Sequence, residues 1–177
     1  MQRSASLFMV YMIVMASSDI QLISFRLDKQ TYAVDILESR EIIRKQKIHE
    51  YPKLPEFIEG VINLRGKIIP VIDLKKRLKG SHMTILPSSR LIIVRLKKQR
   101  KLLFGLLVDQ VKQVIRCSQQ DLFAPPEALN DIDHAFIKGL LSYKEDLIIL
   151  LDLNKLFTQP EKSYIMNTNI KKVIADE

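Results

Sequence analysis

The sequence predicts an all-β protein built from two small β-barrels with short helical segments. The main support is an internal duplication, because two stretches of 22 residues align without a gap. Apolar runs of strand length recur through both copies and are separated by polar turns, whereas long runs with helical periodicity are scarce. A chain of 177 residues is long enough to bury a core without disulfides or a metal ion.

The duplication relates residues 57–78 to residues 136–157, and two shorter upstream stretches align in the same order. The identical pairs are Phe57 and Phe136, Ile58 and Ile137, Gly60 and Gly139, Ile69 and Ile148, Asp73 and Asp152, Leu74 and Leu153, and Lys76 and Lys155. The alternative is that two β-rich halves merely share composition. We predict a duplicated domain over residues 19–158, with an N-terminal extension over 1–18 and a tail over 159–177. The two units span about 19–79 and 88–158.

In the first unit, Ile20–Leu27 is a short apolar run that leads through a polar turn into a second run, the pattern of a β-hairpin. A further hairpin is predicted from Gly60–Leu64 and Lys67–Leu74. Arg65-Gly66 or its neighbours form the turn, since glycine takes a positive φ without strain. Pro70 cannot donate a hydrogen bond to a neighbouring strand, so we expect it at an edge or a bulge.

The second unit repeats these elements, with a strand at Arg90–Leu96 and a hairpin formed by Gly139–Ser142 and Leu147–Leu153. Nearly continuous apolar runs such as LIILLDL predict strands that are buried on both faces or that form closed barrels. Helical structure is expected only as short turns, at Leu54–Glu59, at Asn154–Phe157 and in the tail from Gln159.

The net charge of +8 comes from one part of the chain. Residues 74–108 hold ten basic residues and no acidic one, which leaves 18 basic against 20 acidic residues elsewhere. Aromatic side chains that would stack on bases are absent between Leu74 and Lys101. A solvated or partner-facing basic surface is therefore favoured over a nucleic-acid site.

The N-terminal run Ala5–Ala16 is apolar over twelve residues, about 18 Å as a helix and too short for a bilayer core of about 30 Å. It fits a signal peptide weakly, because Arg3 precedes it and small residues lie near its end. It also fits an upstream extension from a misassigned start, with Met15 opening a shorter chain.

Residues for catalysis or metal binding do not form a recognisable pattern. His49, His82 and His134 lie in unrelated loop-like segments, without a cysteine or carboxylate at metal-ligand spacing, and are expected to be surface histidines. Cys117 has no partner in a C-x-x-C motif and is expected to be buried and inert. Asp73 and Asp152 occupy equivalent places, so we expect the same structural role twice, a side-chain hydrogen bond at a strand end. The sequence thus predicts a protein that is not an enzyme and needs no cofactor or metal.

The segment 60–74, GVINLRGKIIPVIDL, resembles the signature of the CheW family, the coupling proteins of bacterial chemotaxis. Residues 32–37, YAVDIL, with Glu41-Ile42 after them, resemble the second recurring block of that family. The similarity extends over about residues 19–158. It implies two five-stranded SH3-like barrels and a non-enzymatic scaffold that couples chemoreceptors to the histidine kinase CheA.

The resemblance also implies where partners bind. Arg65 and Glu41 are expected as a charged pair near the receptor-binding surface, with Asn63 in the same motif. Ile36, Ser39 and Val108 are expected near a groove between the barrels that takes a helix of the chemoreceptor tip. Ser39 departs from the aliphatic residue that is frequent there. Kinase contacts are expected at barrel edges. Arg65 contacting a partner and Arg65 fixing only the turn geometry remain equal alternatives.

Family membership further implies a cytoplasmic protein in membrane receptor arrays, which touches the membrane only indirectly and is not expected to bind nucleic acid. It favours an extension or misassigned start over a signal peptide at the N-terminus. The alternative function is a basic β-barrel module that binds nucleic acid or anionic lipid through residues 74–108. Binding through phosphates would weaken steeply as salt rises, whereas docking in an apolar groove would weaken little.

Overall fold

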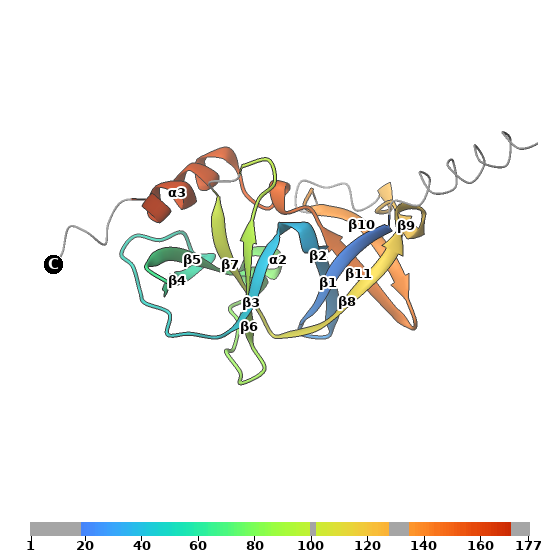
Figure 1. Ribbon diagram of the computed structural model, residues 1–177, viewed down its shortest axis with the longest axis horizontal. Coiled ribbons are helices and arrows are strands. Elements are labelled where there is room, and N and C mark those ends of the chain that lie inside the picture. Colours follow the sequence, from blue (N-terminus) through green and yellow to red (C-terminus); the bar gives the residue numbers. More distant parts are fainter. Residues whose placement is uncertain (1–18, 100–101, 128–134, 171–177) are drawn as a thin grey trace, which may run out of the picture.

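The computed structural model describes residues 19–99, 102–127 and 135–170. Within these ranges, eleven β-strands and a few short helices form the fold, which confirms the predicted all-β class (Figure 1). Among the described residues, no helix has the length and apolar character needed to cross a membrane. The predicted N-terminal extension, residues 100–101 of the basic stretch, His134 and the last seven residues of the tail lie outside the described residues.

The strands form a six-stranded and a five-stranded sheet, which lie side by side in Figure 1. The six-stranded sheet has the order β8 (Gln110–Ser118), β1 (Asp19–Leu27), β2 (Gln30–Asp35), β11 (Asp146–Leu151), β10 (Ile137–Tyr143) and β9 (Leu122–Phe123). The five-stranded sheet has the order β3 (Ser39–Arg44), β6 (Arg90–Arg95), β7 (Leu103–Val108), β5 (Lys67–Asp73) and β4 (Ile58–Leu64).

Strand pairing is exchanged between the two predicted units. The β1–β2 hairpin of the first unit joins β8, β10 and β11 of the second, and the β6–β7 hairpin of the second joins β3, β4 and β5 of the first. Each sheet has one parallel and one antiparallel pairing between the units: β2 with β11 and β1 with β8 in the six-stranded sheet, and β7 with β5 and β3 with β6 in the five-stranded sheet. Each sheet therefore combines strands from 19–79 and 88–158, rather than one sheet coming from each unit.

Both sheets close into barrels in the same way. In the five-stranded sheet, His49 follows the edge strand β3 and pairs with Val61 on the opposite edge strand β4 through backbone bonds of 2.8 and 2.9 Å. In the other sheet, β9 follows the edge strand β8 and pairs with β10, where Phe123 lies opposite Leu140. Val61 and Leu140 are equivalent in the duplication, so the closure is duplicated too.

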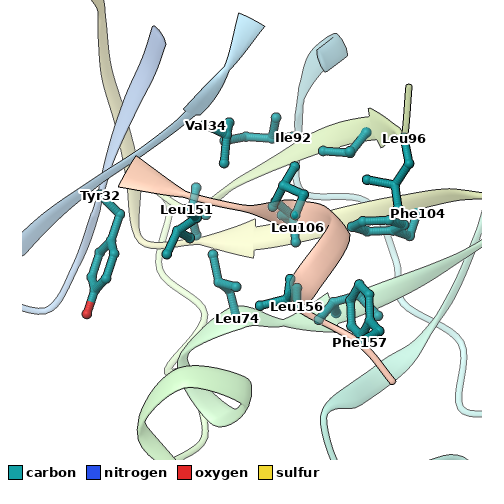
Figure 2. Packing of buried hydrophobic residues seen from close by; sticks show 14 of the residues in the cluster. Tyr32, Val34, Leu74, Ile92, Leu96, Phe104, Leu106, Leu151, Leu156 and Phe157 are labelled. Carbon is teal, nitrogen blue, oxygen red and sulfur yellow. The ribbon is translucent and has the colours of Figure 1, made fainter. Parts of the chain in front are cut away.

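The largest core cluster takes buried side chains from both sheets (Figure 2). Tyr32 and Val34 of β2, Ile92 of β6 and Phe104 of β7 all belong to it. A second cluster belongs to the six-stranded sheet and a third to the five-stranded sheet. Neighbouring residues on the central strands alternate between clusters, as Leu91 and Ile92 do. These strands are thus buried on both faces, as the continuous apolar runs predict.

Three short helices follow the duplicated segments. The α-helix α2 (Leu74–Lys79) comes after β5, the 3₁₀ helix η5 (Leu153–Lys155) after β11, and α3 (Gln159–Ile170) ends the described chain. The sequence did not predict α2, and α3 is one continuous helix instead of weak turns. Arg77 holds α2 and α3 together, because its guanidinium binds both carboxylate oxygens of Glu161 at 3.0 and 3.1 Å and lies over the ring of Phe57.

Candidate functional site: a charged turn on a closed barrel

The turn between β4 and β5 displays Arg65. Leu64 and Lys67 are paired, so Arg65 and Gly66 form a two-residue loop, and both have positive φ, 52° and 80°. Positive φ at both central residues is the mark of a type I′ turn, which matches the twist of a hairpin. The side-chain oxygen of Asn63 accepts a hydrogen bond from the Gly66 amide at 2.9 Å and fixes the turn. The predicted turn is confirmed, and Asn63 has a structural role in it.

Glu41 reaches this turn from the other edge of the same sheet. The Arg65 guanidinium donates to both carboxylate oxygens of Glu41, at 2.7 and 2.9 Å. A register shift between Ser39 and Glu41 marks a bulge in β3, and bulges often redirect a side chain next to a functional site. Because β3 and β4 are the two edges of the sheet, the pair bridges the closure of the barrel. The expected charged pair is present.

The Arg65–Glu41 pair stands at the surface, since 75% of the Arg65 side chain is exposed. The hydrogen bond from Arg65 lowers the pKa of Glu41, and the same bond raises the pKa of Arg65. Both groups therefore stay charged near neutral pH. Solvent screening makes such an exposed pair a weak contributor to folding. Its bidentate geometry instead holds the guanidinium in a defined orientation on the surface.

The three apolar-groove candidates lie in different surroundings. Ile36 lies half-buried in the 3₁₀ helix η1 (Ile36–Glu38), against the largest core cluster. Ser39 is half-buried at the start of β3, and its amide donates to the Ile36 carbonyl. Val108 is fully buried in the core. Exposed apolar surface on these elements comes instead from Leu37, which is 73% exposed, and Ile42, which is 42% exposed. Nothing in the sequence pattern predicts that these two side chains are exposed.

Five of the eight basic residues that the structure describes in the stretch 74–108 form ion pairs within the chain. Lys75 and Lys79 bind Asp28 at 2.6 and 3.4 Å, and Lys97 binds Asp35 at 2.8 Å. Lys76 pairs with Glu56, and Arg77 binds Glu161 as described above. Hydrogen bonding to Lys75 lowers the pKa of Asp28. These pairs remove cations from a phosphate-binding surface, so the nucleic-acid or lipid alternative for residues 74–108 is not favoured.

Asp73 belongs to a cluster of three possible metal ligands that the sequence did not reveal. Ligand atoms of Glu59, Asp73 and His82 all lie within 4.8 Å of one another. His82 is exposed, as expected of a surface histidine, but the loop after α2 folds back and brings it beside Asp73. His82 follows Asp73 by nine positions, a spacing that gives no signal in the sequence. Cys117 is buried, and burial raises the pKa of its thiol, in line with an inert side chain.

Comparison with known proteins accounts for this arrangement. The CheW-like domain profile matches residues 21–161. The chain is 31% identical to the chemotaxis protein CheW of Treponema pallidum, over 83% of this chain and 87% of that protein. It is 35% identical to the chemotaxis protein CheW of Thermotoga maritima, over 81% and 91% of the two chains.

A solved structure agrees with these relatives. The crystal structure of the scaffolding protein TtCheW from Thermoanaerobacter tengcongensis superposes with a TM-score of 0.69 and 40% identity, and the match covers 78% of this chain and 88% of that one. The family consists of non-catalytic scaffolds, which confirms the prediction that the chain is not an enzyme. The fold and the N-L-R-G turn are consistent with these matches. This chain belongs to the CheW-like domain family.

Proposed function

We propose that this chain is a scaffold that couples chemoreceptors to a CheA-type histidine kinase in a chemotaxis signalling complex. Its relatives are named chemotaxis proteins, and the solved structure is named a scaffolding protein. The observation that carries the proposal is the bidentate Arg65–Glu41 pair, which is held on the surface by a type I′ turn and a bulge. Such a scaffold works in the cytoplasm and meets the membrane only through its receptors.

The receptor contact is proposed around this pair, η1 and β3. A helix of the receptor tip presents apolar residues at i, i+3, i+4 and i+7, and needs exposed apolar side chains opposite them. Leu37 and Ile42 supply such side chains on the same elements that carry Ile36 and Glu41. Val108 supports this surface from the core and does not touch the partner, because it is fully buried.

The kinase contact is proposed at the barrel edges. β8 and β9 are the outer strands of the six-stranded sheet, and they carry the exposed apolar residues Val114 and Phe123. Edge strands with exposed apolar residues favour pairing with another chain. Receptor and kinase sites on separate barrels let one rigid protein hold both partners, and a coupling free energy of about 1–3 kcal/mol is enough to change kinase output.

The test is a binding titration with the cytoplasmic tip of a chemoreceptor and with the regulatory domain of the kinase. Arg65→Glu is expected to weaken receptor binding at least tenfold, because it places two carboxylates together on the contact surface. Lys144→Glu is the matched control, since Lys144 is the equivalent turn residue of the other unit, and it should bind as the wild type does. Neither change should alter thermal melting.

The charge-swapped variant Glu41→Arg/Arg65→Glu separates the two roles of the pair. Restored receptor binding in the double variant would show that the pair only fixes the turn. Continued loss of binding, with unchanged melting, supports direct contact with the receptor. A wild-type chain that binds neither partner would contradict the scaffold proposal itself.

A further inference from the structure

The carboxylate of Asp73 is buried and held rigidly at the end of β5. One of its oxygens, Oδ1, accepts a hydrogen bond from the Lys76 amide, and Oδ2 accepts one from the Met83 amide, both at 2.9 Å. The second bond pulls the loop after α2 back over the carboxylate. His82 immediately precedes Met83, and its Nδ1 lies 3.6 Å from Asp73 Oδ2.

Glu59 on β4 completes a group of three ligand-bearing side chains, because β4 and β5 are neighbours and Ile58 pairs with Ile72. Two carboxyl groups thus converge on one point. Two carboxylates placed this close repel each other, and a bound cation would relieve that repulsion.

The equivalent place in the second unit shows that this cluster is not needed for the fold. Asp152 also accepts a backbone hydrogen bond, from the Asn154 amide at 3.0 Å. The residue that matches Glu59 by sequence is Lys138, which could not share a metal ion with Asp152. Capping the end of a strand thus explains the two aspartates, but it explains neither Glu59 nor His82.

We propose that Glu59, Asp73 and His82 bind a divalent transition-metal ion, with zinc as the best fit. One imidazole nitrogen with two carboxylate oxygens is a donor set that zinc accepts, and such a site leaves a fourth position for water. Zinc bonds of about 2.0–2.2 Å place neighbouring ligand atoms about 3.4 Å apart in a tetrahedral site. The His82–Asp73 distance of 3.6 Å is already close to this value.

The side chains can complete the site with little movement. The side chain of His82 is 64% exposed, so it has room to turn toward an ion, whereas two backbone amides hold Asp73 in place. Each carboxylate oxygen has two lone pairs, so Asp73 Oδ2 can bind a metal while it accepts the Met83 amide. Backbone amides that orient a ligand carboxylate are a common outer shell of metal sites. The bound ion would join the loop after α2 to β4 and β5, a function separate from partner binding.

The experiment uses the full chain after removal of metal with a chelator. Zinc is titrated by isothermal calorimetry, and thermal melting is recorded with and without zinc. The expected result is one zinc ion per chain and a higher melting temperature when zinc is present, because zinc binds the folded state. Cobalt should give a visible absorption band typical of tetrahedral coordination.

Variants assign the ligands. His82→Ala and Glu59→Gln should each weaken zinc binding at least tenfold and abolish the cobalt band, while their metal-free melting stays at the wild-type value. His49→Ala is the control for non-specific histidine binding and should change neither result. Saturable zinc binding that survives both ligand changes, or the absence of saturable binding in the wild type, would overturn the proposal.

Discussion

The β4–β5 hairpin of the first unit and the β10–β11 hairpin of the second have the same strand pairing and different turns. Arg65 and Gly66 both have positive φ, whereas in the equivalent loop only Lys144 does. Each has a register shift just before its glycine, and each ends in an aspartate whose amide donates to a phenylalanine carbonyl, at 2.8 Å for Asp73 and 2.7 Å for Asp152. Arg65 at the first turn is replaced by Lys144 at the second. Identity between the units thus marks what closes a barrel, and the charged residues that differ are where we propose that partners bind.

The glycines provide the most severe test of the shared closure. A Cβ at Gly60 would lie 2.4 Å from the His49 carbonyl oxygen, whereas one at Gly139 would lie 3.2 Å from that of Phe123. Gly60→Ala should lower the free energy of unfolding by about 3 kcal/mol, and Gly139→Ala by about 1 kcal/mol or less. Urea unfolding of both variants measures the difference, and equal losses would show that the two closures are equally tight.

Replacing the aspartate of the first hairpin should also destabilise the protein more than replacing the aspartate of the second. Asp73 is fully buried and accepts two backbone amides, whereas Asp152 is half-buried, with one amide bond to its side chain among the described contacts. Asp73→Ala should cost about 2 kcal/mol of stability, because it removes the cap of α2 and leaves the Met83 amide unpaired. Asp152→Ala should cost about 1 kcal/mol. If urea unfolding gave the larger loss for Asp152→Ala, the loop over Asp73 would be less tightly held than its hydrogen bonds indicate.

A buried carboxyl beside the second aspartate gives a smaller, pH-dependent effect. Burial is the main cause that raises the pKa of Glu38, and the charge of Asp35 raises it further. The side-chain amide of Asn154 donates a hydrogen bond to the Glu38 carboxylate at 3.4 Å. A carboxyl whose pKa is raised in the folded state favours folding when protonated, and this advantage is lost as pH rises through the folded pKa.

Glu38→Gln should therefore raise stability at pH 7 by less than about 1 kcal/mol, since it removes a buried charge and keeps an oxygen that can accept the Asn154 bond. The gain should shrink as pH falls toward the ordinary value of 4.5. Urea midpoints across this pH range provide the measurement. A gain that grows on acidification would show that the carboxylate stabilises the fold.

The two hairpins that close the barrels can be predicted from the sequence, because the residues that close them recur in both units. The duplicated glycines and aspartates identified both hairpins, and the family resemblance identified the Glu41–Arg65 pair. The exchange of strands could not be predicted, since both units have the same apolar pattern and either sheet would accept the other hairpin. The helix α2 does have signals, an N-cap at Asp73 and Gly80 in the left-handed conformation with φ 73°. Its six residues are too few for helical periodicity to show.

The surface turns should show the smallest effect on folding and the largest on function. The Arg65–Glu41 pair is exposed and screened by solvent, so Arg65→Ala and Lys144→Ala should leave the urea midpoint unchanged. Receptor binding should nevertheless fall with the first change only, and the loss should be partly mimicked in the wild type by high salt. If Arg65→Ala lowered stability as much as binding, the pair would belong with the glycines and aspartates that close the barrel. The two turns would then differ in their contribution to stability, and Leu37 and Ile42 would remain as the proposed receptor contacts.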